Sequence, residues 1–505
     1  MSMFMDAWKN INEMKLTENG AVARNTTHAA VYDMLALGGA YRHRSIEDVM
    51  LLFKKAYEED ADLALKTLFY LRDIRGGQGE RRFFRAAFHY LCKVDADVAH
   101  ELLPYVADFG RYDDLWYATE GTPVFQYAID EIVEPQLKLD TQCKTPSLLG
   151  KWMPSENASS EITISMANKI RTMLGMSHKE YRKMLTALRK KINVLETLMS
   201  ANRWDEIEFD KIPSKAGLIY KNAFARRDII AKKYEEFAKS AETKVNADTL
   251  YPYEIVAKAC PYGKAHYDWS QGSYVFDSID ETDRAMINKY WENLPDYLDG
   301  AEVSMMAVID TSGSMTGRDA SAPINTAIGL GIYCAERMSG PFAGHFISFS
   351  QNPQLIDLEG IDFVDKAQRV MLRSEVANTD LVATFDLLKR MALSDPECAA
   401  TMPKTLVVIS DMEIDMMSDW SHDMAETEME RVRKDWTSEG LELPHLVYWN
   451  VNARRDTFLE DAGNNVTFVS GCSPIIFKSV ITGKTGYELF MEMVGNNERY
   501  ANIHR

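Results

Sequence analysis

The sequence predicts an α + α/β protein, in which an all-helical part precedes an α/β part of the doubly wound, Rossmann type. From about residue 28 to 297 the apolar residues recur at helical spacing, as in "ERRFFRAAFHYLCKV". After "ENLPDYLDGAE" short apolar runs alternate with amphipathic segments, the pattern of a parallel sheet covered by helices on both faces. At 505 residues the chain exceeds one ordinary domain, so we assign 1–300 to the helical domain and 301–505 to the α/β domain.

The helical part shows predicted helices of about 10 to 20 residues with short connections, which suits an array of antiparallel helix pairs. No clean internal period accompanies these helices, so a repeat architecture is inferred from helix lengths alone. The stretch 136–160, "QLKLDTQCKTPSLLGKWMPSENASS", breaks the helical pattern and predicts a long connecting loop.

The α/β part offers five buried strands and one edge strand. The five are expected at 303–309, 344–349, 405–410, 446–451 and 466–470, with helices near 321–339, 380–393, 421–440 and 487–494. The segment 353–359, "PQLIDLE", follows its predecessor after a short turn, so we expect it to form an antiparallel edge strand.

Charge and cysteine usage bound the class of protein. The net charge of −18 argues against a nucleic-acid partner, yet residues 151–250 carry 19 Lys and Arg against 13 Asp and Glu. Six well-separated cysteines without a CxxC pair are typical of reduced thiols. The sequence shows no signal peptide or membrane span, so we expect a cytoplasmic protein that does not enter a membrane.

The first chemically specific stretch is "VIDTSGSM" (308–315), where an apolar run ends in one carboxylate and two alternating hydroxyls. A serine nucleophile, a phosphate-binding loop or a metal site would each account for it. A nucleophile elbow reads GxSxG, and neither Ser312 nor Ser314 has glycines on both sides at that spacing. A P-loop match at 478–485, "KSVITGKT", fails because Lys478 stands where glycine is required.

A metal site fits the stretch better, because hard divalent cations bind oxygen ligands. The residues that would supply them follow three predicted strands or loops: Asp310, Ser312, Ser314, Thr379 and Asp411. Ligands of doubly wound sheets bind beyond the carboxyl ends of the strands, where these residues are expected. Mg²⁺ is the expected ion, with Mn²⁺ or Ca²⁺ as alternatives, and one coordination position would stay open for an acidic group of a partner.

These five positions resemble the metal-ion-dependent adhesion site (MIDAS) of von Willebrand factor A domains, DxSxS…T…D. The resemblance implies an A-domain fold for residues 301–505. The sequence departs from the pattern at Met412, where many A domains have glycine, and Glu413 and Asp415 add negative charge nearby.

The helical part resembles a second family. "RDIRGGQGERRFFRAAFHYL" (72–91) and "LPYVADFGRYDDLW" (103–116) are similar to the helical (TROVE) module of Ro autoantigen and related proteins. "SHKEYRKMLTALRKK", "LPHLVYWNV" and "FVSGCSP" resemble more closely an uncharacterised Ro-like family of plants, fungi and large DNA phages. The resemblance covers nearly the whole chain and implies a HEAT-like helical ring closed by a von Willebrand A domain. It also implies binding of RNA, with single-stranded ends in the ring and structured RNA on its basic outer face.

Two basic groups are candidates for RNA contacts. The first surrounds the "GGQG" turn and comprises Arg72, Arg75, Arg81, Arg82 and Arg85. The second recurs at helical spacing within 161–192 and comprises Lys179, Arg182, Lys183, Arg189 and Lys190. Each has a simpler alternative: the arginines would form salt bridges to Asp73, Glu80 and Asp113, and the lysine-rich stripe would be a solvated helix face.

The sequence thus predicts a non-enzymatic, cytoplasmic RNA-binding scaffold of the Ro type, with RNA on the helical domain and a divalent metal in the A domain. The RNA would be single-stranded or a small structured RNA. The alternative is a protein-docking module in which the metal captures a partner's carboxylate and no RNA is bound. Metal-dependent hydrolysis is a weaker hypothesis, since no general base is evident near Asp310.

Overall fold

The computed structural model describes residues 14–505 except 193, 271, 300, 350–351, 359–361, 375–378 and 416–425. It confirms the predicted α + α/β architecture, with a helical part followed by a mixed, mainly parallel sheet. None of the helices in these ranges is both long and apolar enough to cross a membrane. All six cysteines are free, and four of them are buried.

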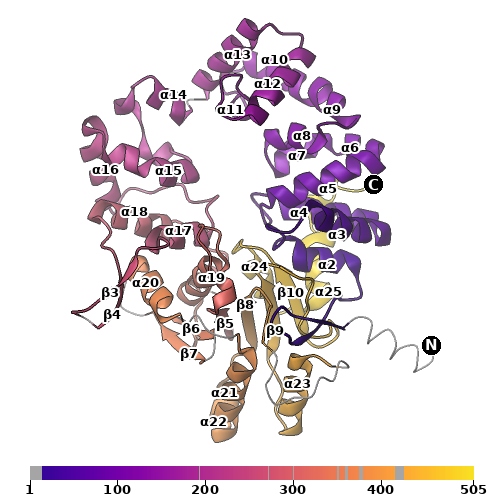
Figure 1. Cartoon of the computed structure of the whole chain (residues 1–505), viewed down its shortest axis with the longest axis vertical. Helices are drawn as coiled ribbons and strands as arrows, with labels where there is room; N and C mark the ends of the chain where they lie inside the picture. Colours follow the sequence, from indigo (N-terminus) through magenta and orange to yellow (C-terminus); the bar gives the residue numbers. More distant parts are fainter. Residues whose placement is uncertain are drawn as a thin grey trace.

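The helical part runs from residue 30 to 292 (Figure 1). Its helices are α2 (Ala30–Gly38), α3 (Ile46–Glu59), α4 (Ala61–Arg72), α5 (Arg81–Val94), α6 (Ala96–Glu101), α7 (Leu103–Phe109), α8 (Tyr112–Thr119), α9 (Val124–Tyr127), α10 (Glu134–Gln142), α11 (Leu149–Trp152), α12 (Glu161–Met173), α13 (His178–Lys191), α14 (Leu195–Ser200), α15 (Ser214–Ala225), α16 (Asp228–Lys239), α17 (Pro252–Ala259) and α18 (Glu281–Glu292). A hairpin, β3 (Ala265–Asp268) and β4 (Ser273–Phe276), precedes α18.

Local sequence explains where these helices begin and which face they bury. Helix α13 begins with a capping box, in which Ser177 and Glu180 each accept the other's backbone N–H. In α5 the apolar residues Phe84, Phe88 and Leu91 recur at three and four residues and are fully buried. The predicted loop at 136–160 is wrong in part, because a π-helical turn joins α9 to α10 and carries the helix to Gln142.

The sheet has the strand order β10-β9-β8-β5-β6-β7. Its strands are β5 (Met305–Asp310), β6 (His345–Phe349), β7 (Gln354–Asp357), β8 (Thr405–Ser410), β9 (His445–Asn450) and β10 (Val466–Ser470). Neighbours pair in parallel except β7, which is antiparallel to β6 and confirms the predicted edge strand. The central strands are buried throughout, which is why they read as continuous apolar runs.

Helices cover both faces of the sheet. They are α19 (Pro323–Arg337), α20 (Phe363–Arg373), α21 (Leu381–Ser394), α22 (Pro396–Thr401), α23 (Glu428–Ser438), α24 (Ile476–Val480) and α25 (Gly486–Phe490). Gly331 of α19 approaches Ile309 and Phe346 on one face, whereas α21 lies over Met306 and Ile347 on the other. Sequence patterning did not predict α20, α22 or α24, and residues 421–425 of one predicted helix lie outside the described ranges.

The helical array and the sheet together form a closed ring of elements (Figure 1). At one end of the array, α2 packs on β10, where the Phe468 backbone N–H donates to the Tyr32 hydroxyl at 2.8 Å. At the other end, α17 and α18 pack on α19 and α20, and the Trp291 ring stacks on Phe363 at 3.9 Å. Residues 14–24 also lie on the α/β part, since Arg24 exchanges backbone hydrogen bonds with Phe458. The ring therefore closes through contacts between residues that are far apart in sequence.

The turn at residues 73–80 joins three of these distant segments. Buried Asp73 binds Arg499 and accepts a hydrogen bond from the Tyr500 hydroxyl, both from the C-terminal tail. The Gln78 carbonyl accepts the Tyr251 hydroxyl at 2.9 Å from the start of α17. This turn, which we call the closing turn, thus holds the first helices, the last helices and the C-terminus together.

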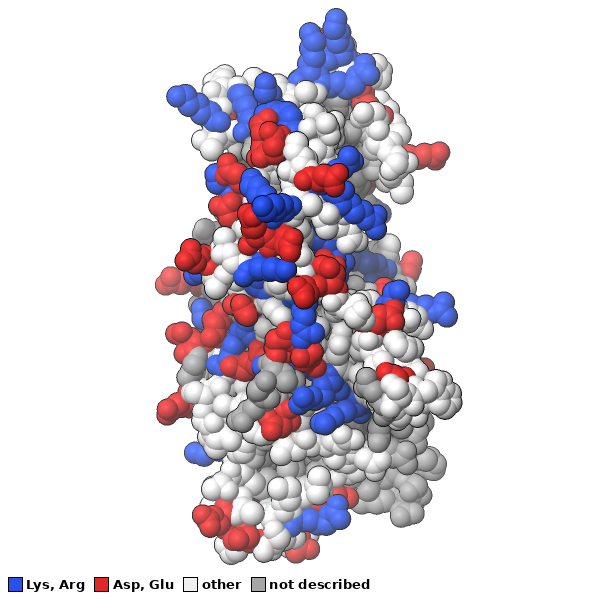
Figure 2. Space-filling model, turned by 90° about the vertical axis from the view of Figure 1, so that its left-hand side faces the viewer, with Lys and Arg blue, Asp and Glu red and all other residues white. Residues whose placement is uncertain are grey.

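Charged side chains of both signs alternate along the side of the molecule shown in Figure 2. Basic side chains gather at its upper end, at the height of α12 and α13 in Figure 1. Acidic and basic groups therefore neutralise each other over most of this face, but not at its upper end.

The closing turn gives the first prediction. Gly79 has φ +67°, and a Cβ there would lie 2.0 Å from the Tyr251 hydroxyl oxygen. We expect Gly79→Ala to lower the free energy of unfolding by about 2–4 kcal/mol, from backbone strain plus overpacking. Gly121→Ala is the matched control, because Gly121 has φ +77° with open space around it, and should cost only about 1 kcal/mol. Equal losses in chemical denaturation would show that Tyr251 moves aside at no cost, so that its close approach to Gly79 does not constrain the closing turn.

Candidate functional site

The parallel pairing of β5 and β8 brings the two predicted carboxylate ligands to one edge of the sheet. Ile309 pairs with Ile409, so Asp310 at the end of β5 lies beside Ser410 and Asp411 at the end of β8. Both carboxyl groups are fully buried, and the Ser410 hydroxyl donates to Asp310 Oδ2 at 2.6 Å. The carboxyl ends of two neighbouring strands thus place two acidic groups together, as predicted.

The loop after β5 adds the two serine hydroxyls. Its backbone turns back at once, because the Ser312 N–H donates to Asp310 Oδ1 at 2.9 Å. A single 3₁₀ turn at Gly313–Met315 then brings Ser314 next to Ser312, with 3.0 Å between their hydroxyl oxygens. The Ser314 hydroxyl also hydrogen bonds to Asp411. Four of the five predicted ligands therefore lie together.

The two carboxyl groups disfavour each other's charge. Burial and, to a smaller extent, the charge of Asp411 raise the pKa of Asp310 to about 7, although hydrogen bonds from Ser312 and Ser410 oppose the shift. Burial also raises the pKa of Asp411, although Arg454 and Ser314 oppose that shift. A pair of desolvated acidic groups of this kind is stabilised by a nearby positive charge.

Thr379, the fifth predicted ligand, is buried and tied to the loop that follows β8. Its backbone N–H donates to Asp415 Oδ2 at 2.6 Å, and its carbonyl accepts the Asp415 N–H at 3.0 Å. The carboxylate of Asp415 is therefore engaged with Thr379. The contacts place Thr379 beside the loop that carries Asp411.

Sequence reasoning missed a cation at this site, Arg454. Its guanidinium lies 2.7 Å from Asp411 Oδ2 and 2.5 Å from the Glu18 carboxylate. Its place in the sequence could have indicated it, because Arg454 follows the carboxyl end of β9, the strand next to β8, and therefore belongs to the same edge of the sheet. The side chain of Asp411 is thus already paired with a positive charge.

The N-terminal segment lies against the loop after β8. The Glu18 backbone N–H donates to Glu413 Oε2 at 2.5 Å, and Thr17 donates its hydroxyl to the Ile414 carbonyl at 2.7 Å. Burial raises the pKa of Glu413. The extra acidic residues after Asp411 are therefore turned toward the N-terminal segment and Thr379.

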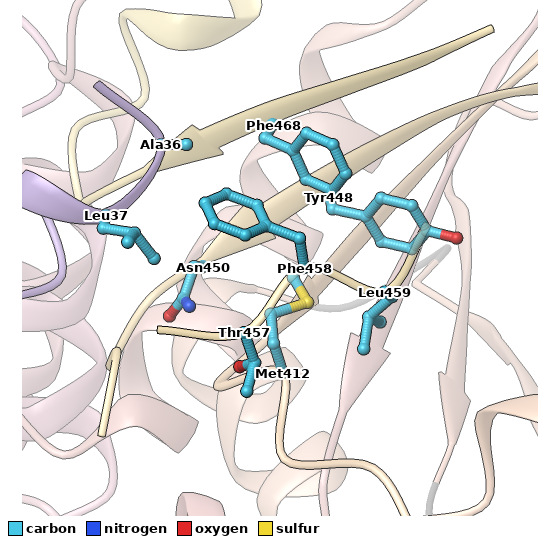
Figure 3. Close-up of a pocket in the computed structure, with 9 residues that line it drawn as sticks. All are labelled: Ala36, Leu37, Met412, Tyr448, Asn450, Thr457, Phe458, Leu459 and Phe468. Carbon is cyan, nitrogen blue, oxygen red and sulfur yellow. The ribbon is translucent and has the colours of Figure 1, made fainter. Parts of the chain in front are cut away.

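Met412 takes the left-handed backbone conformation, with φ +61°, that favours glycine at this position of the resembled motif. Its side chain is buried and lines a small cavity between α2 and the ends of β9 and β10 (Figure 3). The cavity measures about 10 Å³, the lower limit for one water molecule, so it is no ligand site.

The donor set suits a hard divalent cation. Two carboxylates and two hydroxyls are the oxygen ligands that Mg²⁺ prefers, and a dication would relieve the repulsion between Asp310 and Asp411. Such an ion must either displace Arg454 from Asp411 or share the Asp411 carboxylate with it. Within the described ranges no cluster of three or more His, Cys, Asp or Glu side chains could hold a metal, so any ion here would rely on hydroxyl ligands.

The arginines around the closing turn divide into two kinds. Arg72 is buried and binds Asp114 at 2.7 Å, and Arg85 contacts Asp113 and Asp114. These two residues hold α4, α5 and α8 together through ion pairs, the kind of role that the sequence left open as the alternative, and their contact with RNA stays a prediction. Arg75, Arg81 and Arg82 are exposed.

The basic stripe on α13 also divides. Lys179, Arg182, Lys183 and Lys190 are exposed, and Arg182 lies 3.8 Å from Glu156. Arg189 instead folds back, donating to the carbonyls of Gly150 and Met153 and to the Ser155 hydroxyl at 2.8–3.0 Å. Its guanidinium fixes the chain around the end of α11, so Arg189 does not share the exposed face of the other four residues.

The buried acidic pair gives the second prediction. Asp310→Asn removes one of two adjacent buried charges while keeping a polar group of the same size, so metal-free protein should gain about 1–3 kcal/mol of stability at pH 8. The measurement is urea denaturation in the presence of a chelator. Asp319→Asn, on an exposed residue of the same loop, is the control and should change stability by less than about 0.5 kcal/mol. A loss of stability in Asp310→Asn would mean that the two carboxyl groups do not repel each other.

Comparison with known proteins gives three similarities. Residues 304–501 match a family described as a domain of unknown function (DUF7788). Residues 17–96 and 154–301 match another domain of unknown function (DUF2828), so the two matches meet just before β5. The chain is also 29% identical over 512 residues to an uncharacterized protein, L728, of Acanthamoeba polyphaga mimivirus, an alignment that covers 93% of this chain and 85% of that protein.

Proposed function

We propose that the protein is a non-enzymatic RNA-binding scaffold, in which the helical part holds RNA and the α/β part binds a divalent metal. In this proposal the helices form a HEAT-like repeat array, and the α/β part is a von Willebrand A-like domain whose metal site is Asp310, Ser312, Ser314, Thr379 and Asp411. The sheet order with one antiparallel edge and the clustering of four of these residues support it.

The observation that carries the RNA proposal is the exposed basic face of α13. Lys179, Lys183 and Lys190 have no acidic partner in the described part of the chain, although the whole chain has a net charge of −18. Other exposed lysines, such as Lys138, Lys169 and Lys211, are paired with acidic side chains. Phosphate groups would supply the missing counter-charge, and their binding releases condensed ions.

The location of this face also favours RNA over an incidental solvated helix. It lies at the end of the molecule farthest from the acidic α/β part, where basic side chains gather (Figure 2). A polyanion bound there avoids the repulsion of residues 301–505, which hold 17 Lys and Arg against 30 Asp and Glu. Exposed Arg75, Arg81 and Arg82 would extend the contact along the array.

The metal would act in recognition. Asp310, Asp411 and the hydroxyls of Ser312 and Ser314 would hold Mg²⁺. Thr379, which is hydrogen bonded to Asp415 in the loop that follows β8, would be the fifth ligand. A bound dication supplies a positive centre that attracts an acidic group of a partner. The residues themselves orient the site: Ser410 fixes the Asp310 carboxylate, and Arg454 and Ser314 fix that of Asp411.

A salt titration tests the basic face. For single-stranded RNA the logarithm of affinity falls against log salt with a slope of about −0.7 per neutralised phosphate. Changing Arg182 and Lys183 together to glutamine should therefore flatten that slope by about 1 to 1.5 units, and similarly for different RNA sequences. The matched control changes Lys54 and Lys55, an exposed adjacent pair on α3 near Glu58, to glutamine. This variant should leave the slope unchanged. An unaltered slope in the α13 variant would mean that this face is a solvated helix surface that does not contact phosphates.

Thermal or chemical unfolding in Mg²⁺ tests the metal site. At a hundred times its Kd, Mg²⁺ should raise the free energy of unfolding by about 2.7 kcal/mol, because it binds only the folded chain. Asp310→Ala should abolish this gain, whereas Asp319→Ala, on the exposed residue of the same loop, should keep it. Equal stabilisation of both variants would place the ion elsewhere.

The protein-docking alternative predicts a different result from the same protein. Capture of an acidic peptide that requires Mg²⁺ and Asp310, together with no saturable RNA binding, would replace the RNA proposal. RNA binding that persists in the presence of a chelator would support the RNA proposal.

A further inference from the structure

The candidate metal site already contains a positive charge that belongs to the chain. Asp310 and Asp411 are fully buried at the ends of β5 and β8. Within the described ranges Arg454 is the only cation that forms an ion pair with either of them, and its guanidinium lies 2.7 Å from Asp411 Oδ2. In the absence of an ion, Arg454 therefore supplies the counter-charge that two desolvated carboxylates require.

The other donors to these two carboxylates are uncharged. Asp310 accepts hydrogen bonds from the Ser312 N–H and the Ser410 hydroxyl. A backbone N–H donates to Asp411 Oδ1 at 3.2 Å, whereas Arg454 donates to Oδ2. A carboxylate oxygen has two lone pairs, so it accepts an uncharged donor and binds a cation at the same time, but a guanidinium and a dication repel each other. Arg454 is thus the group that an entering ion has to move.

Arg454 is held less firmly than Arg499, the arginine that binds the closing turn. Arg499 places Nε and Nη2 on the two carboxylate oxygens of Asp73, a paired contact that is stronger than a single one. Arg454 instead divides its contacts, with Nη2 on Asp411 and Nη1 on the Glu18 carboxylate. Its Nε is buried and has no hydrogen-bond partner in the described part of the chain. The side chain is also 32% exposed, so it can leave Asp411 without disturbing the core.

Glu18 gives Arg454 a second partner that does not belong to the predicted ligand set. Its carboxylate lies 2.5 Å from Nη1 of Arg454 and is half-exposed. The backbone around Glu18 is fixed on the loop after β8, because the Glu18 N–H donates to Glu413 Oε2 at 2.5 Å and the Thr17 hydroxyl donates to the Ile414 carbonyl at 2.7 Å. Arg454 can therefore leave the metal site and remain paired with a carboxylate.

We propose that Arg454 is an internal counter-ion, which takes the charge position of the divalent cation when no ion is bound and pairs with Glu18 alone when the cation binds. The inference rests on the proposed metal site and adds the residue that sets its affinity. Competition with Arg454 weakens the binding of Mg²⁺, and Glu18 limits this competition because it stabilises the displaced guanidinium. The N-terminal segment that carries Glu18 thus takes part in metal binding without supplying a ligand.

Isothermal titration calorimetry of the full-length protein with Mg²⁺ tests the competition. Arg454→Gln should bind Mg²⁺ about tenfold more tightly than the parent protein, because it removes a positive charge next to the ion. Damage to the loop would weaken binding instead, so tighter binding cannot come from misfolding. Arg455→Gln is the matched control, because Arg455 is the exposed neighbour that binds the Leu16 and Thr17 carbonyls and forms no ion pair with Asp411 within the described ranges. This variant should bind Mg²⁺ like the parent protein.

A double-mutant cycle tests the role of Glu18. Glu18→Gln keeps the backbone contact with Glu413 but removes the charge that receives Arg454. Mg²⁺ should therefore bind about threefold more weakly, which is the scale of one exposed ion pair. In the Arg454→Gln background the same change should leave the Kd unaltered, because no displaced guanidinium needs a partner. Equal weakening in both backgrounds would mean that Glu18 acts on the ion directly, and would overturn its proposed role.

Unchanged or weaker Mg²⁺ affinity in Arg454→Gln would overturn the inference, and so would equal tightening in Arg455→Gln. If the parent protein then still binds Mg²⁺ and Asp310→Ala abolishes this binding, the metal site stands and only the role of Arg454 is lost. Mg²⁺ binding by Arg454→Gln but not by the parent protein would support the inference, since Arg454 would then outcompete the ion. No binding by either protein would overturn both the inference and the proposed metal site.

Discussion

The structure depends on the closing turn, because this short segment holds both ends of the helical array and the C-terminus. Gly77 allows its backbone to pass Tyr70, where a Cβ would lie 2.0 Å from the Tyr70 carbonyl oxygen. Asp73 is fully buried, so its charge must be compensated, and Arg499 compensates it from the C-terminal tail. Without that arginine the buried carboxylate would have hydrogen bonds but no counter-charge, which ties the stability of the first helices to the last residues of the chain.

The α/β part was predictable from sequence because its strands are buried on both faces. Such strands are continuous apolar runs with a sharp polar end, and β8 and β10 lie where the sequence placed them. The same rule located Asp310 and Asp411, since the carboxyl ends of parallel strands share one edge. Arg454 escaped prediction because an arginine in a loop gives no local sign that it will reach a carboxylate 43 residues away.

The basic residues show where sequence patterns lose information. Arg72 and Arg82 flank the same turn, yet one is buried against Asp114 and the other is exposed. Arg189 and Lys190 are adjacent on α13, yet only Arg189 turns back to bind the chain near Gly150. Spacing along a helix shows which residues share a face, but tertiary contacts decide whether that face meets solvent or another segment. The planar guanidinium, with five donors, suits arginine to such internal roles, whereas exposed lysines remain available to phosphates.

The candidate metal site and the ring closure are physically linked through the loop after β9. Arg454 binds Asp411 on one side and Glu18 on the other. Its neighbours in this loop hold the turn after α2: the Ala453 N–H donates to the Ala40 carbonyl, and Asp456 accepts a hydrogen bond from the Tyr41 hydroxyl. A cation and Arg454 compete for the same Asp411 oxygens, so binding of the ion would weaken the hold of Arg454 on Asp411. The contact between Arg454 and Glu18 would change as well, because it is made by the same guanidinium. The acidic edge of the sheet is therefore connected to the N-terminal segment by the Arg454 side chain, and to the turn after α2 by the residues beside Arg454 in the same loop.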